Sequence, residues 1–372
     1  MRCEATSSKL DVKNKNLDPL SNLTRSVVRL TLQGMEDVVK QYPVGSLQNL
    51  SRISSGLIHQ TYLVVTSGGK YILQRLHPDL SSDSILADYR AVTEHLAAQE
   101  FASPRLILSV DGRVAVDRED GRYRLMTFLE GNSYESVVDG ETAGEAARML
   151  GSFHIALNEF RYAFTSGRPL HDSPRHFADF LGTLAKHKKH VLMEEAKELS
   201  DRIERHLPKH FLPTPLPSRV VHGDPKISNI LFHPETGKAT GLVDLDSCAR
   251  HTVLVDIGDA VRSWCRTGPE DHCTPFLPDR FSSVCEGYCR SGAVLSGIER
   301  KLIVQACRLI TLELASRFLR DVFEDRYFGW DSSRFPYRSA HNLARASGCI
   351  ALYDSMMGQE ETMEKIVREV WK

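Results

Sequence analysis

Two short segments of the sequence hold side chains that can perform chemistry together. Residues 221–229 read V-H-G-D-P-K-I-S-N, and residues 241–246, which follow after a short turn, read G-L-V-D-L-D. Asp224 can orient a hydroxyl group and accept its proton. Asn229 and Asp244 offer the hard oxygen ligands that Mg²⁺ prefers. These groups, in this order, are what phosphoryl transfer from ATP requires, so we predict ATP and Mg²⁺ as cofactors.

Two further polar residues lie within the same segments. Lys226 follows Asp224 by two positions, where a lysine can stabilise charge on a transferring phosphate; a solvated surface lysine is the alternative. Asp246 follows Asp244 by two positions and could serve a second metal or the acceptor, or cap the segment that follows. We therefore predict Lys226 as catalytic and Asp246 as a substrate contact.

A β-hairpin is expected to carry both segments. Apolar residues at 230–232 and 240–245 flank the turn-forming sequence at 234–238. The two strands of a hairpin lie side by side, so residues before the first strand and at the end of the second meet. The hairpin should therefore bring Asn229 and Asp244 to one end of the ladder.

The elements around this hairpin change from strands to helices along the chain. Apolar runs joined by a Gly-Gly turn predict two strands within 50–75, and short strands are predicted at 105–116 and 123–129. Apolar periodicity predicts helices at 23–42, 84–99, 143–157 and 173–206, and again from the hairpin to the C-terminus.

The two chemical segments resemble the motifs of small-molecule kinases related to aminoglycoside phosphotransferases and choline kinases. Residues 222–224 stand where protein kinases carry H-R-D, and Asp244 stands at the metal-binding Asp of D-F-G. The resemblance implies an α+β, protein-kinase-like two-lobe fold. Residues 1–22 are rich in Ser, Asn, Lys and Asp, so we expect a flexible extension there. The resemblance then implies an ATP-binding N-lobe at 23–130 and a C-lobe at 131–372 that holds the catalytic loop and the acceptor site.

Within that family the sequence resembles the N-acetylhexosamine 1-kinases, from about Ile53 to about Ala346. This resemblance implies phosphorylation of the anomeric hydroxyl of an N-acetylhexosamine, and it implies that Arg317 and Tyr327 contact the sugar. A helix-face ion pair and a core aromatic residue are the alternatives for these two positions. The segment that contains them is one residue shorter than in the family. Other acceptors remain open: an aminoglycoside, choline or ethanolamine, or homoserine.

The family resemblance also implies where the nucleotide binds. Ser55 and Gly56 lie in a loop between strands, where main-chain N–H groups would cover the phosphates. Thr127 and Leu129 lie in the hinge, where the main chain would bond the adenine.

The sequence departs from the family at the strand that should present a cation to the phosphates. The aligned position is Gln74 or Arg75, and neighbouring strand residues point to opposite faces, so only one faces the nucleotide. Gln74 matches the register better, and it carries no charge. The partner acid on the next helix would be Asp88 or Glu94. This departure raises a second hypothesis, a nucleotide-binding regulator without catalytic activity.

One downstream residue helps to define the substrate class. Asp256 resembles the aspartate that braces the catalytic loop in this family. It follows Asp244 by about a dozen residues, too few for the activation segment of a protein kinase. This spacing argues against a protein substrate.

Composition sets the remaining limits. The chain has 372 residues, with Lys and Arg totalling 47 and Asp and Glu totalling 48. This balance argues against duplex DNA or an anionic membrane as a partner. None of the 8 cysteines forms a C-x-x-C pair, so no zinc site is expected. No secretory signal and no stretch of ~18 apolar residues is present. We expect a cytoplasmic enzyme whose partner is a small molecule, an amino sugar; the sequence does not indicate an oligomeric state.

Overall fold

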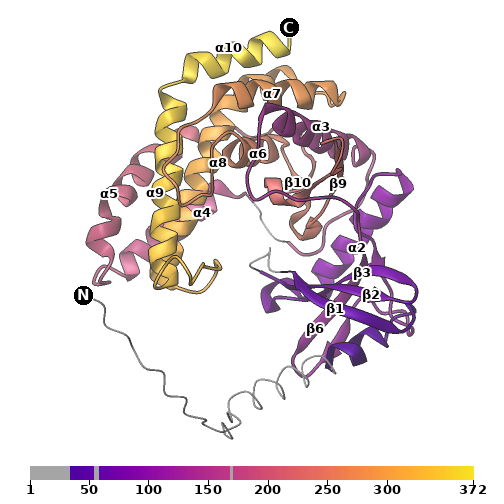
Figure 1. Cartoon of the computed structure of the whole chain (residues 1–372). Coiled ribbons are helices and arrows are strands. Elements are labelled where there is room, and N and C mark those ends of the chain that lie inside the picture. Colours follow the sequence, from indigo (N-terminus) through magenta and orange to yellow (C-terminus); the bar gives the residue numbers. More distant parts are fainter. Residues whose placement is uncertain (1–33, 54–57, 168–170) are drawn as a thin grey trace, which may run out of the picture.

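The N-terminal part of the structure is an antiparallel sheet packed beside one long helix. The computed structural model describes residues 34–53, 58–167 and 171–372 (Figure 1). The main path of the sheet runs in the order β1-β2-β3-β6-β4, and β5 pairs with β6. The strands are β1 (Leu47–Ile53), β2 (Gln60–Thr66), β3 (Gly69–Arg75), β4 (Leu106–Ile107), β5 (Val116–Arg118) and β6 (Gly121–Thr127). Helix α2 (Asp83–Ala98) follows β3.

The sequence predicted most of this lobe from local patterns. The Gly-Gly turn joins β2 to β3 in register, with Thr66 opposite Gly69, and the predicted helix at 84–99 matches α2. The strand predicted over 105–116 was wrong, because β4 covers only Leu106–Ile107 before a turn leads into β5. A helix includes residues 34–39; the rest of the helix predicted at 23–42 and the extension at 1–22 lie outside the described residues.

Helices make up most of the C-terminal part. In chain order they are α3 (Gly140–Ala156), α4 (Ser173–Lys186), α5 (Met193–His206), α6 (Leu254–Trp264), α7 (Pro278–Arg290), α8 (Gly297–Glu324), α9 (Arg338–Met357) and α10 (Glu360–Val370). Helix α8 is the longest, at 28 residues, and it contacts α4, α5, α6 and α9. None of the helices in the described part of the chain is long and apolar enough to cross a membrane.

The single helix predicted over 173–206 was wrong, because the chain breaks at 187–192 into α4 and α5. An unbroken helix of that length would extend ~50 Å at the usual rise per residue. With the break, both α4 and α5 pack against α8 (Figure 1). The buried Leu192 lies at the end of this connection. Tertiary packing therefore overrides the continuous helical pattern here.

The predicted catalytic hairpin is present between the helices. It consists of β8 (Ile230–Phe232) and β9 (Ala239–Leu242), with Ile230 opposite Leu242. A second pair, β7 (Arg219–Val221) and β10 (Ala249–His251), lies on either side of it in sequence. The hairpin also bridges to the segment that leaves the N-lobe, since Asn132 and Phe232 exchange main-chain hydrogen bonds.

Gly131 allows this close approach between the hinge and the hairpin. Its φ of +148° lies in a region that side chains rarely adopt. A Cβ atom there would lie 3.0 Å from Leu231 Cβ and 3.2 Å from the carbonyl oxygen of Phe232. The glycine is therefore required both by its backbone conformation and by the space available.

Candidate active site

Asn229 and Asp244 meet at one end of the β8–β9 hairpin, as the sequence predicted. The main-chain N–H of Val243 donates to the carbonyl oxygen of Asn229 at 2.9 Å, which extends the ladder by one bond. The Asn229 amide nitrogen lies 3.5 Å from Asp244 Oδ2. Asp244 has a φ of 68° and a ψ of 57°, a left-handed conformation that is uncommon for a residue with a side chain. This conformation turns the chain sharply out of β9 into a short helical turn.

Asp224 and Lys226 lie beside this pair. Lys226 Nζ is 2.8 Å from Asp224 Oδ2 and 3.9 Å from Asp244 Oδ2. Desolvation alone would raise the pKa of Asp224, but the Lys226 ammonium outweighs it and holds this pKa below its usual value. Asp224 is therefore a charged carboxylate at neutral pH, able to accept a hydrogen bond from a hydroxyl group.

The donor set at the end of the hairpin suits Mg²⁺. Asn229 is buried, and its amide nitrogen donates to the carbonyl oxygen of Asp224 at 2.8 Å, which fixes the amide and leaves Oδ1 as the cation ligand. The carboxylate of Asp244 supplies the second protein oxygen. Mg²⁺ in phosphoryl-transfer sites commonly takes one or two protein oxygens and completes its shell with phosphate and water. Accordingly, the described residues contain no cluster of three or more His, Cys, Asp or Glu side chains that could hold a metal alone.

Asp256 braces the catalytic loop through its main chain, as the family resemblance implied. Its two carboxylate oxygens accept from the N–H groups of His222 and Gly223, each at 2.7 Å. His154 lies 2.9 Å from Asp256 Oδ2 and completes the shell of this fully buried acid. His222 Nε2 also lies 3.0 Å from the carbonyl oxygen of Val243, so the loop and the metal-binding segment are tied together.

A second buried acid supports the loop from the opposite side. His171 Nδ1 lies 2.8 Å from Glu313 Oε1 on α8, and His171 Nε2 lies 3.1 Å from the carbonyl oxygen of Gly223. Both partners are acceptors, so both ring nitrogens carry protons. Burial alone would lower the pKa of His171, but the Glu313 carboxylate raises it above the usual value. The imidazolium therefore fixes the carbonyl of the residue that precedes Asp224.

The N-lobe face opposite the hairpin carries an arginine that the sequence analysis did not identify. Arg124 on β6 lies directly across from Gln74 on β3, and its Nε and Nη2 atoms donate to Gln74 Oε1 at 2.9 and 2.7 Å. The same guanidinium binds both oxygens of Asp246, at 2.6 and 2.5 Å. Asp246 is buried and also lies 3.4 Å from His59 Nε2. The side chain of Asp246 is thus held by residues of the N-lobe. These contacts are not those of a residue that caps the next segment, which was one alternative for Asp246.

The structure separates the remaining candidates for the phosphate contact. Arg75 donates to the main-chain carbonyl of Asp120 and so points away from Gln74. Asp88 accepts hydrogen bonds from residues 162–166 of the C-lobe. Glu94 pairs with an exposed arginine on its own helix. Neither Asp88 nor Glu94 forms an ion pair with a side chain of β3. Gln74, Arg75 and these two acids therefore do not form the lysine–glutamate ion pair that is usual in kinases.

At the hinge, Thr127 is already engaged. Its main-chain N–H donates to the carbonyl oxygen of Arg105 at 2.9 Å, and its hydroxyl accepts from the Arg105 N–H at 3.0 Å. An adenine contact at Thr127 would therefore need another main-chain group. Leu129 lies over the catalytic hairpin, where its Cδ1 atom would be 3.4 Å from a Cβ on Gly241. Ser55 and Gly56, predicted to cover the phosphates, lie outside the described residues.

Arg317 lies in the C-terminal half of α8, and Tyr327 follows the end of this helix. Arg317 Nη1 is 4.0 Å from Glu313 Oε1, and its guanidinium lies 5.8 Å from the centre of the Phe328 ring. The main-chain N–H of Tyr327 donates to Asp321 Oδ1 at 2.8 Å, and the residue is 42% exposed. Arg317 contacts Glu313, Glu313 contacts His171, and His171 contacts the carbonyl oxygen of Gly223 in the catalytic loop.

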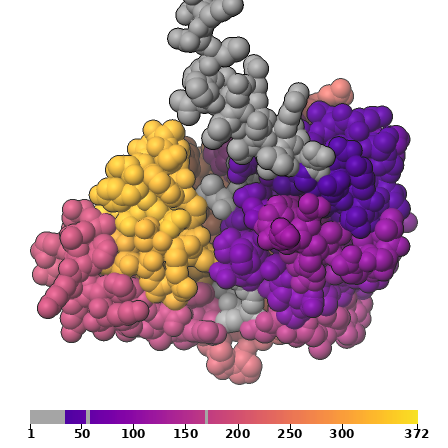
Figure 2. Space-filling model, turned by 90° about the horizontal axis from the view of Figure 1, so that it is seen from below, coloured from indigo at the N-terminus to yellow at the C-terminus, as the bar shows by residue number. Residues whose placement is uncertain are grey.

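A pocket between the two lobes contains Tyr327. Its N-lobe wall contributes Ile58, His77, Asp79 and Leu80, and its C-lobe wall contributes Arg326, Tyr327, Phe328, Gly329 and Arg338. Figure 2 shows the C-terminal part of the chain, in yellow, and the N-lobe, in indigo and violet, on opposite sides of the molecule. Tyr327 is therefore one of the residues on the C-lobe side of this pocket.

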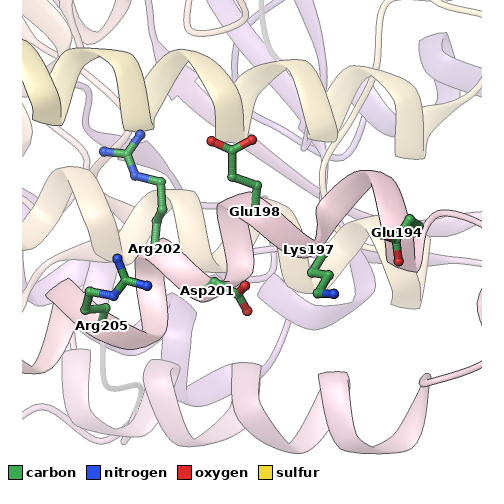
Figure 3. A pocket seen from close by; sticks show the side chains of 6 residues that line it. All are labelled: Glu194, Lys197, Glu198, Asp201, Arg202 and Arg205. Atoms are coloured by element: carbon green, nitrogen blue, oxygen red, sulfur yellow. The ribbon is translucent and has the colours of Figure 1, made fainter.

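A second surface hollow lies away from the catalytic loop, along α5. Six charged side chains line it: Glu194, Lys197, Glu198, Asp201, Arg202 and Arg205 (Figure 3). Arg202 reaches from this helix to Asp354 on α9. The mixed charges and the open shape are typical of a solvated helix face, and no chemistry is assigned to it.

Sequence reasoning missed four of the side chains that hold the site in place. His154, His171 and Glu313 come from helices or loops more than thirty residues from the loop that they support, and no local motif marks them. Arg124 was detectable only through the pairing of β3 with β6, which sets it opposite Gln74. The seven cysteines in the described part of the chain are all free, as expected for reduced thiols.

Comparison with known sequences identifies a family and several relatives of this chain. Residues 49–277 match a family model described as "Phosphotransferase enzyme family". A homoserine kinase from Zymomonas mobilis is 26% identical over 251 residues, which cover 67% of this chain and 74% of that protein. A homoserine kinase from Rhizobium meliloti is 26% identical over 297 residues, which cover 78% of this chain and 82% of that protein.

Solved structures share the fold at lower identity. A microcompartment-associated aminopropanol kinase has a TM-score of 0.59 at 20% identity, with 88% of this chain and 98% of that chain covered. The GDP complex of a mutant aminoglycoside 2'-phosphotransferase has a TM-score of 0.62 at 15% identity, with 86% and 97% covered. These similarities confirm the predicted α+β, protein-kinase-like fold.

Proposed function

The chain belongs to the phosphotransferase enzyme family and is a small-molecule kinase, and we propose that it transfers the γ-phosphoryl group of ATP to the anomeric hydroxyl of an N-acetylhexosamine. The observation that carries the proposal is the convergence of Asp224, Asn229 and Asp244 at one end of the β8–β9 hairpin. Intact catalytic and metal-binding side chains argue against the alternative of a regulator without activity.

Each residue has a defined role in the proposed reaction. Asp224 orients the acceptor hydroxyl toward the γ-phosphorus and accepts its proton as the new P–O bond forms and the bond to the leaving ADP oxygen breaks. Asn229 and Asp244 hold Mg²⁺, which would neutralise charge on the phosphates. Lys226 lies between the two aspartates and can donate to an oxygen of the transferring group. Asp256 and His171 keep the loop in place from two sides.

The acceptor assignment rests on two C-lobe residues, Arg317 on α8 and Tyr327 in the pocket between the lobes. Arg317 can donate to several hydroxyl or carbonyl oxygens, and the exposed ring of Tyr327 can stack on a sugar face. Tyr327 presents an apolar ring and one hydroxyl, a combination that suits a neutral polyol. These properties support an amino sugar whose nitrogen is acetylated and therefore uncharged.

Homoserine is the second candidate, because the homoserine kinases named above are similar over most of this chain. Homoserine has a carboxylate that Arg317 could bind and an ammonium group that needs an acid. Arg317 lies 4.0 Å from Glu313, but His171 also occupies that carboxylate. Glu313 is therefore already in use, so the ammonium group of homoserine would need another acid, such as Asp79 in the pocket that contains Tyr327.

The experiment that separates the candidates measures ADP release from Mg²⁺ATP with purified full-length protein and a panel of acceptors. The panel contains N-acetylglucosamine, N-acetylgalactosamine, homoserine, choline, ethanolamine and an aminoglycoside. We expect release with an N-acetylhexosamine, and ³¹P NMR of the product should show a sugar 1-phosphate. Release with homoserine alone would replace the proposed acceptor.

A variant of Arg317 and a matched control test the acceptor site. Replacing Arg317 by Met should raise the KM for the acceptor by about 10-fold or more, with the KM for ATP unchanged. Arg368→Met is the control, because Arg368 on α10 is exposed, pairs with Glu364 and does not line the pocket that contains Tyr327. Equal effects of both variants, or an effect on the KM for ATP alone, would remove Arg317 from the acceptor site.

A further inference from the structure

The guanidinium of Arg124 is a deeply buried charged group that joins the two lobes. Its side chain is 1% exposed and the carboxylate of Asp246 is 4% exposed. The plane of the guanidinium also lies 4.2 Å from the centre of the Tyr89 ring on α2. An arginine of the N-lobe sheet and an acid of the catalytic segment therefore meet in a site closed to water, where a bidentate pair is strongest.

Four of the five N–H donors of Arg124 are used within this cluster. Nη1 and Nη2 bind the two oxygens of Asp246, and Nε and Nη2 bind Gln74 Oε1. Gln74, the uncharged residue on β3, thus accepts hydrogen bonds from the guanidinium of Arg124 on the neighbouring strand β6. A two-point contact with a phosphate would require Arg124 to leave Asp246, which would leave a buried carboxylate without its cation.

Asp246 lies two residues after Asp244, within the single helical turn η4 (Leu245–Ser247). Asp244 has the left-handed conformation described above, which is costly for a non-glycine residue and persists only where its surroundings hold it. On the N-terminal side, the hydrogen bond from Val243 to Asn229 holds it. On the C-terminal side, the Asp246 carboxylate is the side-chain anchor within two residues; Arg124 binds both of its oxygens and His59 lies 3.4 Å from one of them.

We propose that Arg124 is a positioning residue, which fixes the metal-binding conformation of Asp244 through its bidentate ion pair with Asp246. In this arrangement the N-lobe sheet controls the geometry of the metal site from β6. Other kinases have a lysine–glutamate ion pair that joins β3 to the nearest helix. Here the Arg124–Asp246 ion pair joins β6 to the catalytic segment instead. The inference rests on the proposed function, because it assumes that Asp244 binds the metal of a metal–nucleotide complex.

The test compares metal binding with turnover in four variants of the full-length protein: Arg124→Met, Arg124→Lys, Asp246→Asn and the double variant Arg124→Met/Asp246→Asn. Mn²⁺ serves as the probe, and its binding in the presence of ADP is followed by electron paramagnetic resonance. Because a residue that orients a metal ligand typically changes metal affinity by ~10–100-fold, we expect both Met and Asn variants to weaken Mn²⁺ binding by about 10-fold or more.

The double variant should bind Mn²⁺ no more than about 3-fold more weakly than either single variant, since both changes remove one interaction. Arg124→Lys keeps the charge but loses the two-point contact, so it should fall between the wild type and Arg124→Met. Arg122→Met is the control, because Arg122 is on the same strand and its ion pairs with Asp83 and Asp117 stay within the N-lobe. It should leave Mn²⁺ binding unchanged, and circular dichroism should show that every variant is folded.

Two results would overturn the proposal. One is unchanged Mn²⁺ binding in Arg124→Met with a raised KM for ATP, which would make Arg124 a phosphate contact. The other is additive losses in the double variant, which would show that Arg124 and Asp246 act separately. Mn²⁺ binding with ADP needs no acceptor, so this test remains valid even if the wild type fails to phosphorylate any acceptor and the proposed function is wrong.

Discussion

The side-chain amide nitrogen of Asn229 lies 3.5 Å from Asp244 Oδ2, although the two residues are 15 positions apart. The β8–β9 hairpin closes this distance by pairing Ile230 with Leu242. Two oxygen-bearing side chains are thereby placed at the end of a rigid element, beside the carboxylate of Asp224. A site built on paired strands holds its geometry better than one built on a loop.

Asp244→Asn tests the metal site at this end of the hairpin. Loss of the carboxylate charge should lower kcat by about 100-fold or more and raise the Mg²⁺ concentration needed for half-maximal activity, because the metal stabilises the transition state by several kcal/mol. The measurement is ADP release across a Mg²⁺ titration. Asp111→Asn, in an exposed N-lobe turn, is the control and should match the wild type. An unchanged Mg²⁺ dependence in Asp244→Asn would remove Asp244 from the metal site.

Asp256→Asn tests the brace of the catalytic loop. The amide can accept only one of the two main-chain hydrogen bonds that Asp256 receives from His222 and Gly223. Because bonds to a charged group contribute about 1.5–3 kcal/mol each, the free energy of unfolding should fall by about 3 kcal/mol, and kcat should fall with it. Urea denaturation gives the first quantity and ADP release the second.

The control for this variant is Asp354→Asn, which breaks a partly exposed ion pair with Arg202. Such pairs contribute at most about 1 kcal/mol, so its stability should stay close to that of the wild type. Equal stability losses in the two variants would contradict the bracing role of Asp256.

Gly131→Ala tests the close contact between the hinge and the hairpin. Its φ of +148° and the 3.0 Å approach to Leu231 Cβ should make the change cost about 3 kcal/mol, because strain and overlap add. Gly237→Ala is the matched control, with a φ of +66° and open space around the added atom. It should cost only about 1 kcal/mol. Thermal or urea unfolding measures both, and equal costs would contradict the assigned overlap.

The His171–Glu313 pair predicts a pH-dependent contribution to stability. His171 has a pKa raised above 6.5, so its contribution is complete below pH 6.5 and disappears as the pH rises through the raised value. Glu313 has a pKa of about 2, against 4.5 for a free glutamate, because His171 outweighs the effect of burial. Its contribution is complete above pH 4.5 and disappears as the pH falls toward 2. The full effect of the pair therefore lies between these two limits.

His171→Gln should consequently lower the free energy of unfolding by about 3 kcal/mol near pH ~5.5, and by less at alkaline pH. Asp259 on α6 also raises the pKa of His171 and Arg317 on α8 lowers it, so both are kept intact in the variant. Urea denaturation over a pH series measures the difference from the wild type. His233→Gln, on the exposed hairpin turn, is the control. A difference that stays constant from acid to alkaline pH would contradict a charged His171.

The sequence was most informative where chemistry and local structure coincide. The apolar runs around 234–238 predicted the hairpin, and the hairpin predicted that Asn229 and Asp244 would meet. The sequence did not predict contacts between residues that are far apart in the chain. Gln74 and Arg124 are 50 residues apart, and His171 and Glu313 are 142 residues apart. No local pattern marks such partners, because three-dimensional packing alone selects them. The same holds for the break at 187–192, where the helical rhythm continues but packing on α8 does not allow one helix.

The assignments of individual residues to catalysis, metal binding and substrate contact remain predictions, as do the boundaries of the two lobes. Among them, Asp224 is the most directly testable. It is one-third exposed at the end of the hairpin, and Lys226 holds its carboxylate in the charged form.

The most direct test compares acceptor-dependent ADP release by the wild type and by Asp224→Asn, with N-acetylglucosamine and N-acetylgalactosamine as acceptors. Loss of a general base lowers turnover by ~10²–10⁴-fold, and the variant should still bind Mg²⁺ADP and unfold at the wild-type temperature. Wild-type turnover that falls by this amount in a folded variant is the predicted result. Full activity in Asp224→Asn would contradict the proposed mechanism.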